Sequence, residues 1–575
     1  MDLSFNSKYT LSQRYLIKDK SGKVIETPEE MMRRVAKVVA SAELLYYQDE
    51  YHTLNLETKF FEILTNLEFV PNSPTLMNAG RPLGLLSACF RIPIKDDLVA
   101  IADAFKWMII IQKAGGGTGF SFSDLRPEGD YIASTGGTSS GPLSFMAMFD
   151  AGTACIKQGG KRRGANMSVM NVHHPDIMKF IYAKIDENNN PYKNFNLSVG
   201  VTDKFLQALE KGEKYEIINP HNNVVEGMVS AQLIWEHLCA LSWMNGEPAV
   251  LFLDTIEKAN PTPTLGKLDA TNPCGELPLL PFESCNLGSI NLSKFVKYGK
   301  VDFERLEYVT RLAVRFLDNV IDVNKFPLPE IEKITKANRK IGLGVMGWAD
   351  MLIQLGIRYD SEEAVDLAKS VMEFIANVAK ETSRDLGAEK GDFPNFEIST
   401  YSNYLNEDRH MRNATVTSIA PTGTISIIAD CSFGIEPVFG IITQRNVEAS
   451  MGKKFLEINP AVKAILKKQG KWNGIKEALA SGTCINLSKN IRELIPTAQN
   501  IAPEWHVKMQ AAFQMFTDNS ISKTVNLPKS ATVEDISNIY LMIYKMGCKG
   551  TTVYREGSRQ FQLLQESNGA CPTCN

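Results

Sequence analysis

The chain has 575 residues, of which 44% are hydrophobic and 22% are charged, a composition typical of a globular protein with a large core. Its formal net charge of −3 provides no general basic field, which argues against a nucleic-acid polymer as the main partner. The sequence has no apolar run long enough to span a membrane and no signal-peptide core, so we expect a cytoplasmic protein with no membrane partner.

The first 70 residues are predicted to be mainly helical. Thr27 is a preferred helix-capping residue, Pro28 and Glu30 suit a first helical turn, and MMRRVAKVVASAELL follows with helical apolar spacing. A second helix is predicted over 58–67. Further helices that pack on the core are predicted over 231–243, 303–320 and 361–386, and residues 440–520 also show helical spacing.

The first stretch with candidate binding side chains is residues 69–80, which contain PNSPTLMNAG. Pro71 and Pro74 interrupt a helix, and Ser73 and Thr75 offer hydroxyl groups in the resulting loop. A simple polar turn would give the same pattern.

Small residues dominate three later stretches, GGGTG (115–119), ASTGGTSSG (133–141) and GGKRRGAN (159–166). The first allows close approach of a ligand, but its order is neither that of a dinucleotide fingerprint nor that of a P-loop, and a tight crossing of strands explains it equally well. In the third stretch, cations lie between glycines and suit a loop that contacts a nucleotide, with a solvated surface loop as the alternative: Lys161, Arg162 and Arg163.

The central feature of the sequence is TNPCGELPLLPFESCNLGSINLS, residues 271–293. Asn272 and Glu276 flank Cys274 at two residues on either side, so all three side chains can face one pocket in a strand-like piece or a tight loop. Pro273 and Gly275 favour the loop. An amide and a carboxylate beside a thiol indicate a reaction centre, whereas a turn with a buried cysteine is the plainer interpretation.

The histidines of the sequence do not form a metal-binding pattern. His173 and His174 are adjacent, but the chain has only seven histidines and no set of ligands at metal spacing, so we expect no protein-bound zinc or iron. The glycine-containing stretch RKIGLGVMGWAD, residues 339–350, is assigned a structural role only.

A second hydroxyl-rich loop is APTGTIS, residues 420–426. If a helix begins near this loop, its amides and positive dipole end would receive phosphate, together with Thr422, Gly423, Thr424 and Ser426. Cys431, just beyond, is interpreted as structural.

Ten cysteines in this composition favour reduced or catalytic thiols over structural disulfides. Cys571 and Cys574 form the only close pair, in CPTC near the end of the chain. With no second such pair to complete a zinc site, a redox pair is the better interpretation.

Taken together, the motifs resemble those of ribonucleotide reductases. NPCGE followed by SCNLGSINL resembles the family's active-site loop, and further similar stretches occur in the same order from about residue 12 to 560: PNSPTLMNAG, SACF (87–90), GGGTGFSFSDLRPEGD (115–130), GGKRRGAN, APTGTISIIADCSFGIEP (420–437) and KGTTVYREGSR (549–559).

The resemblance implies a fold that composition alone would not predict beyond mixed α/β. We expect an α/β protein whose catalytic domain, residues 71–560, is a ten-stranded α/β barrel of two five-stranded halves with Cys274 on a central finger loop. Residues 1–70 would form a mainly helical N-terminal region without the family's ATP cone, and residues 561–575 a mobile redox tail.

The resemblance also implies roles for single residues. Cys274 would become a thiyl radical, with Asn272 orienting the ribose and Glu276 taking the 3′-hydroxyl proton. Cys89 and Cys285, which lie 196 positions apart, would supply the reducing electrons, and the tail pair would then reduce their disulfide. Ser73, Thr75 and the 420–426 loop would hold substrate phosphates, while Asp96 and the cations of residues 161–163 would serve a specificity effector.

The radical source distinguishes the classes of this family. Thr551, Thr552, Val553 and Tyr554 stand where classes with a separate metal subunit carry two neighbouring tyrosines, and no C-terminal glycyl-radical motif is present. TTVYREGSR most resembles the class that uses adenosylcobalamin, which is therefore the expected cofactor.

Expected partners are a ribonucleoside di- or triphosphate substrate, a dNTP or ATP effector, a thioredoxin-like reductant and a second copy of the chain. Two alternatives stay open. The chain could be the large subunit of a metal-dependent reductase, or a catalytically inactive nucleotide-binding sensor, although a sensor would need none of these thiols.

Overall fold

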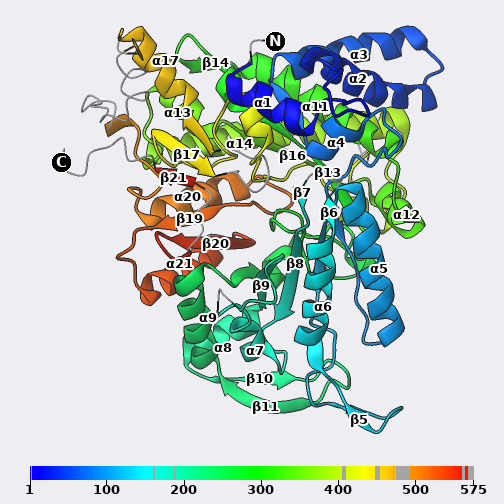
Figure 1. Cartoon of the computed structure of the whole chain (residues 1–575), viewed down its shortest axis with the longest axis vertical. Helices are drawn as coiled ribbons and strands as arrows, with labels where there is room; N and C mark the ends of the chain where they lie inside the picture. The colour runs from blue at the N-terminus through cyan, green and yellow to red at the C-terminus, as the bar shows by residue number, and fades with distance from the viewer. Residues whose placement is uncertain are drawn as a thin grey trace.

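Figure 1 shows the computed structural model of the chain, which describes residues 1, 3–158, 162–186, 189–403, 410–446, 454–470, 472–473, 493–559 and 564–566. Three N-terminal helices, drawn in blue, lie together at one end of the molecule: α1 (Phe5–Arg14), α2 (Pro28–Ala40) and α3 (Glu50–Thr65). The hairpin of β10 (Lys214–Ile218) and β11 (Val225–Ser230) lies at the opposite end.

The start of α2 follows the sequence prediction. Thr27 caps the helix by accepting a hydrogen bond from the backbone of Glu30, and the Glu30 carboxylate accepts one from the Thr27 backbone in return. The prediction for α3 began too late, because the Asp49 side chain caps the helix at Tyr51 and His52, well before residue 58. These helices share a hydrophobic core with α11 (Phe303–Val323).

Five parallel strands form the first half of the main sheet. They are paired in chain order and are β2 (Cys89–Arg91), β3 (Gly117–Ser121), β8 (Asn166–Asn171), β9 (Phe195–Val201) and β12 (Ala249–Phe252). The connecting helices pack on their outer side and share a second hydrophobic core with them: α5 (Leu98–Ala114), α6 (Gly141–Cys155), α8 (Asp203–Lys211) and α9 (Ala231–Asn245).

Five further parallel segments form the second half. They are β13 (Ser284–Asn291), β16 (Ile341–Met346), a segment at 417–419, β19 (Thr524–Leu527) and β20 (Gly550–Arg555). Bridges from Leu343 to Thr417 and from Ile419 to Ile521 link the middle segment to its neighbours. Both joins between the halves, β2 with β13 and β12 with β20, are antiparallel. The predicted ten-stranded barrel of two five-stranded halves is therefore confirmed.

The segment 271–278 lies against strands of both halves of this barrel. Its ends meet in a bridge between Thr271 and Pro278. Asn196 of β9 donates a hydrogen bond of 2.7 Å to the Pro273 carbonyl, which ties the segment to the first half. The Ser418 hydroxyl and the Ser520 amide donate to the Glu276 carbonyl at 3.0 and 2.9 Å, which ties it to the second half. The finger loop is thus held from both sides.

The predicted core helices are present as α9, α11 and α14 (Glu362–Lys390). Residues 440–520 contain strands as well as helices, so a purely helical interpretation of that region was wrong. The antiparallel pair β17 (Ile442–Asn446) and β18 (Lys454–Ile458) precedes α17 (Pro460–Lys468) and α20 (Pro503–Gln514). Within the segment predicted as a tail, β21 (Leu564–Glu566) pairs with β17.

Shorter elements complete the described structure. The helices are α4 (Ser73–Asn78), α7 (Ile177–Ile181), α10 (Leu253–Lys258), α12 (Pro329–Asn338), α13 (Trp348–Leu355), α15 (Ile425–Ala429) and α21 (Val533–Lys545). The strands are β1 (Phe69–Pro71), β4 (Tyr131–Ile132), β5 (Gly137–Thr138), β6 (Lys157–Gln158), β7 (Arg162–Arg163), β14 (Val296–Lys297) and β15 (Lys300–Val301). In the part of the chain that the structure describes, no helix is both long and apolar enough to cross a membrane.

Candidate active site

Cys274 lies at the tip of a tight turn in the finger loop. The Asn272 backbone amide donates to the Leu277 carbonyl at 3.2 Å, and the Gly275 amide donates to the Asn272 carbonyl at 3.1 Å. Gly275 has a φ of +82°, a left-handed conformation that glycine adopts without strain. The turn leaves the Cys274 side chain exposed at the tip, as expected for a loop rather than a buried cysteine.

Three side chains of the loop line one cavity of about 630 Å³. Asn272, Cys274 and Glu276 all contribute to its wall, together with Cys89 of β2. This is the arrangement that their spacing of two residues predicts. Cys274 also lines a second cavity of about 260 Å³, whose other walls come mainly from β9, β12, β19 and β20. The thiol therefore separates two chambers.

The barrel brings Cys89 and Cys285 together although they are far apart in sequence. They are direct partners in the antiparallel pairing of β2 with β13. Opposed residues in such a pair have Cα atoms about 4.5–5.5 Å apart, which is within the range that a disulfide spans. Both thiols are buried, and this burial raises both of their pKa values. Cys89 lines the 630 Å³ cavity and Cys285 is not part of its lining.

Asn272 connects the loop to the dithiol. Its side-chain amide donates to Cys89 Sγ at 3.1 Å, while its carbonyl oxygen accepts a hydrogen bond of 3.0 Å from the Leu277 amide. Because the carbonyl is held by the backbone, the amide group is fixed in the donor orientation toward the sulfur. Asn272 thus sets the position of Cys89 relative to Cys274.

Glu276 has the properties of a proton acceptor near neutral pH. It is 2% exposed, and burial raises its pKa from the usual value near 4.5 to about 7, against a smaller lowering by a hydrogen bond to Asn272. Its Oε2 atom has no hydrogen-bond partner among the described residues. An ionised Glu276 could therefore accept a proton from a hydroxyl group in the cavity.

The two hydroxyl-rich loops supply only part of the predicted phosphate site. Four of the six predicted residues line the 630 Å³ cavity: Ser73, Thr422, Gly423 and Thr424. Thr75 does not, because its buried hydroxyl group hydrogen-bonds to Asn72 and to the Leu86 carbonyl. The helix after the loop, α15, has only five residues, so its dipole offers less to a phosphate than we expected.

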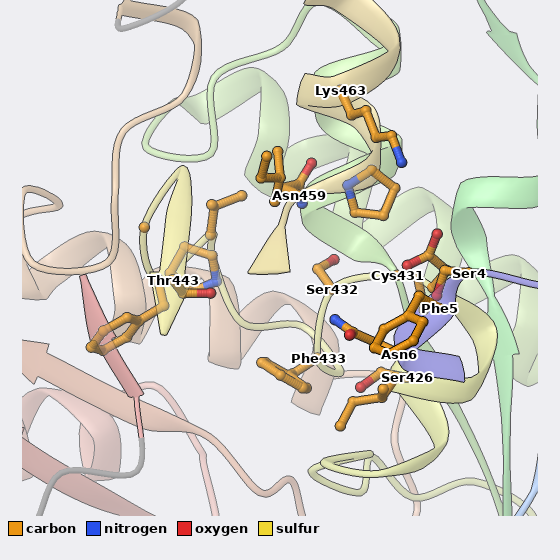
Figure 2. A pocket seen from close by; sticks show the side chains of 18 of the residues that line it. Ser4, Phe5, Asn6, Ser426, Cys431, Ser432, Phe433, Thr443, Asn459 and Lys463 are labelled. Atoms are coloured by element: carbon orange, nitrogen blue, oxygen red, sulfur yellow. The ribbon is translucent and has the colours of Figure 1, made fainter. Parts of the chain in front are cut away.

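Ser426 faces away from the candidate active site, which corrects its predicted place. It lines a separate cavity of about 320 Å³, and Figure 2 shows it there beside Asn6 and Cys431. The reason is geometric, since residues 420–425 of the same loop line the larger cavity and α15 then turns the following side chains away from it. Cys431 is partly buried in this second location.

Sequence reasoning missed one cation in the larger cavity. Arg81 lies directly after the PNSPTLMNAG motif and lines the cavity near Ser73. Its Nη2 atom donates to the Tyr15 carbonyl at 2.6 Å, and its Nε atom has no hydrogen-bond partner within the described residues. A guanidinium group suits a phosphate, and its position next to the motif was the available signal.

The predicted effector acid is paired in this structure. Asp96 accepts hydrogen bonds from Arg126 Nε at 2.8 Å and from His221 Nδ1 at 3.0 Å. Neither partner was predicted, because they lie 30 and 125 residues away in sequence. Arg162 and Arg163 form β7, but only their backbone is described, and Lys161 lies outside the described residues, as do Cys571 and Cys574.

The described residues hold no cluster of three or more His, Cys, Asp or Glu side chains that could bind a metal ion. The adjacent histidines have other surroundings. His174 is buried and hydrogen-bonds to the Leu125 carbonyl at 2.8 Å, and burial lowers the pKa values of both His173 and His174.

Comparison with known proteins agrees with this geometry. The model of the ribonucleotide reductase all-alpha domain matches residues 1–84, and that of the ribonucleotide reductase barrel domain matches residues 87–554. The chain is 46% identical to a vitamin B12-dependent ribonucleoside-diphosphate reductase of Mycobacterium tuberculosis, over 99% of this chain and 81% of that protein. It is 43% identical to the enzyme of the same name from Thermoplasma acidophilum, over 98% of this chain and 80% of that protein.

A solved structure shares the fold. It is the alpha subunit of the class Id ribonucleotide reductase of Actinobacillus ureae, which is 22% identical and superposes with a TM-score of 0.77 over 96% of this chain and 97% of that one. The two family models together cover both the N-terminal helices and the barrel with its finger loop. The chain therefore belongs to the ribonucleotide reductase family.

Proposed function

We propose that this protein reduces ribonucleoside diphosphates to 2′-deoxyribonucleoside diphosphates, with adenosylcobalamin as its radical source. The observation that carries the proposal is the position of Cys274 between two cavities, with Asn272, Glu276 and Cys89 around the larger one. The names of the relatives at 43–46% identity support both the diphosphate substrate and the cofactor.

In the proposed reaction, each of the site's side chains has a distinct role. A thiyl radical at Cys274 removes the 3′-hydrogen of the ribose, and Glu276 takes the proton of the 3′-hydroxyl group. Water leaves from C2′, and the thiols of Cys89 and Cys285 supply two electrons and two protons as they become a disulfide. The hydrogen held by Cys274 then returns to C3′. A nucleotide that fills the cavity would keep water away from these radicals.

The cofactor fits the smaller cavity in part. Adenosylcobalamin, when bound, supplies the radical that converts Cys274 into a thiyl. A cavity of about 260 Å³ is of the size of a nucleoside, so it would take the adenosyl portion and leave the corrin ring outside. Thr552 of β20 contributes an exposed side chain to this wall. The Thr551 hydroxyl group donates instead to Gln510, and the Lys523 ammonium group is paired with Glu436. The Thr552 hydroxyl group is a suitable partner for a ribose or base atom.

The substrate side of the proposal uses the residues that line the larger cavity. Its volume of about 630 Å³ accommodates a ribonucleoside diphosphate. Ser73, Thr422, Gly423 and Thr424 would hold the phosphates at one end, with Arg81 as a cation beside them. The ribose would then lie over Cys274 and Glu276.

Regulation and assembly are part of the same proposal. An effector nucleotide would bind near Asp96 and displace its present partners, Arg126 and His221, while Arg162 and its neighbours sense the base. The exposed apolar side chains of Leu98 and Val99 at the start of α5 favour a contact with a second copy of the chain. A monomeric protein by light scattering in the presence of dATP would contradict this assembly.

The test is product formation by the purified chain alone, under anaerobic conditions with CDP, dithiothreitol and an effector. We expect 2′-deoxycytidine diphosphate only when adenosylcobalamin is added. Activity that instead requires a second protein with a metal centre would favour the large-subunit alternative. Nucleotide binding without turnover under either condition would indicate a sensor.

The raised pKa of Glu276 predicts a specific pH dependence. Since only the carboxylate accepts the 3′-hydroxyl proton, kcat/KM should rise with pH through about 7. Glu276→Gln should lower kcat by about 10²- to 10⁴-fold and abolish that rise. A rise near pH 7 that persists in Glu276→Gln would assign the titration to another group.

The same residue should affect stability with the opposite trend. The folded state binds the Glu276 proton more tightly than the unfolded state, so its contribution is present below about pH 4.5 and is lost as pH rises to about 7. Between pH 5 and pH 8, the free energy of unfolding measured with denaturant should therefore fall by about 3 kcal/mol more in wild type than in Glu276→Gln.

A further inference from the structure

Lys340 is a buried cation that the proposed reaction does not use. It lies between α12 and β16, in the stretch 339–350 to which sequence analysis assigned no chemistry. Its ammonium group donates to Glu283 Oε2 at 2.7 Å, and the two side chains are 2% and 1% exposed. A buried ion pair is costly to form, so it is weak evidence for stability alone and calls for another explanation.

The partner carboxylate is held firmly in place. Glu283 Oε2 also accepts from the Leu280 amide at 2.7 Å, and Oε1 accepts from the Asn338 side chain at 2.5 Å. With both of its oxygens occupied, the carboxylate cannot rotate toward another group. It fixes the Lys340 ammonium at one point beside the start of β13.

That point is next to Cys285. Glu283 lies one residue before β13, and the charges of Glu283 and Lys340 both act on the Cys285 thiol. The Cys285 thiol donates to the Lys340 carbonyl at 3.5 Å and to the Asn286 carbonyl at 3.3 Å. Lys340 thus contacts the sulfur through its backbone carbonyl, while its ammonium group pairs with Glu283.

The two cysteines of the dithiol differ in access. Cys89 lines the substrate cavity, whereas Cys285 is 0% exposed and lies away from that lining. An incoming thiolate from the cavity therefore reaches Cys89 first. The bond from the attacking sulfur to Cys89 forms, the Cys89–Cys285 bond breaks, and the electron pair leaves on Cys285 as a thiolate.

Resting on the proposed function, we propose that Lys340 is a positioning residue for reactivation of the enzyme, which stabilises the Cys285 thiolate released when a dithiol reduces the Cys89–Cys285 disulfide. The second thiol of the reductant then displaces Cys89, and Cys285 takes up a proton. Asn272 provides the matching donor for Cys89, so each sulfur has its own polar partner.

The charges around Cys285 agree with this role. Burial raises the pKa of its thiol, and Lys340 is the principal group that opposes the rise. Glu283 and Glu276 act in the other direction, each with a smaller effect than Lys340. Without the Lys340 ammonium group, the Cys285 thiolate released into this environment would be less stable. Exchange is slower when the leaving thiol has a higher pKa.

The experiment measures reduction of the disulfide separately from turnover. A chain carrying Cys571→Ser and Cys574→Ser is oxidised by one anaerobic turnover with CDP and adenosylcobalamin, and reduction by dithiothreitol is followed from pH 6 to 9 by acid quench and peptide mass spectrometry of the Cys89–Cys285 pair. We expect Lys340→Met to slow reduction about tenfold at pH 7. Lys340→Arg should restore most of the rate, because it keeps the charge.

One further variant keeps the result decisive. Lys340→Met with Glu283→Gln removes the pair without leaving a buried carboxylate unpaired; circular dichroism and CDP binding establish that it is folded. It should reduce more slowly than wild type but faster than Lys340→Met alone, because Glu283 raises the pKa of the Cys285 thiol and Lys340 has the larger opposing effect. Unchanged reduction rates in both variants across the pH range would overturn the proposal. If one turnover gives no disulfide when Lys340 is intact, the proposed function fails, and diamide oxidation of the same proteins still decides the role of Lys340.

Discussion

Cys274→Ser should lower deoxynucleotide formation by at least about 10⁴-fold while leaving CDP binding within a few-fold of wild type. The oxygen of serine holds its hydrogen too strongly to form the radical that the thiol forms, yet the two side chains are nearly the same size. Since the Asn272 and Gly275 hydrogen bonds that shape the turn are backbone interactions, the loop should keep its conformation.

The matched control is Cys155→Ser. Cys155 is also exposed, at the end of α6, but it lines none of the cavities described above. We expect this variant to keep wild-type kcat. Measurement of kcat and of CDP binding for both variants separates loss of chemistry from loss of substrate binding. A Cys274→Ser protein with more than about a hundredth of wild-type kcat would refute a thiyl mechanism at this residue.

The finger loop shows how much of the site could be predicted from local sequence. Pro273 and Gly275 on either side of Cys274 predict a tight turn, and the positive φ of Gly275 gives the physical reason. The alternation of Asn272, Cys274 and Glu276 then predicts one shared cavity. These features depend on residues within five positions of one another, where backbone geometry alone decides which side chains share a face.

Contacts between distant segments were beyond local reasoning. Only the resemblance to a family paired Cys89 with Cys285, because strand register in a barrel depends on every intervening strand. Asp96 offers a contrasting case, since the acid was predicted but Arg126 and His221 were not.

A further error in the sequence prediction concerned the direction of the hydroxyl side chains in the 420–426 loop. Thr424 lines the cavity of about 630 Å³ and Ser426 does not, although they are two residues apart in a loop of hydroxyl groups. The start of α15 at Ile425 lies between them, and helix boundaries are the least predictable feature of a sequence. The same difficulty explains the late start predicted for α3.

The second large effect is expected at Gly119, where the barrel wall and the finger loop are in close contact. A Cβ atom added at this position in β3 would lie 1.8 Å from the Thr271 carbonyl oxygen and 2.8 Å from its carbonyl carbon. Both obstructing atoms are backbone, so no side chain can rotate away. The finger loop would have to move.

Gly119→Ala should therefore lower kcat by about 100-fold or more, since a displacement of about 1 Å at the reacting group is enough for such a loss. It should also lower the free energy of unfolding by about 1–3 kcal/mol, the usual cost of overpacking. Denaturant unfolding and kcat at saturating CDP measure the two effects on the same protein.

Gly227→Ala is the matched control. Gly227 lies in β11, a Cβ atom there would meet nothing within 4 Å, and its φ is not in the left-handed region. It should therefore change both quantities little. If Gly119→Ala kept wild-type kcat and stability, the loop could retreat from β3 without cost, and the placement of Cys274 would then have to depend on the bonds from Asn196, Ser418 and Ser520 rather than on the fit between glycine and loop.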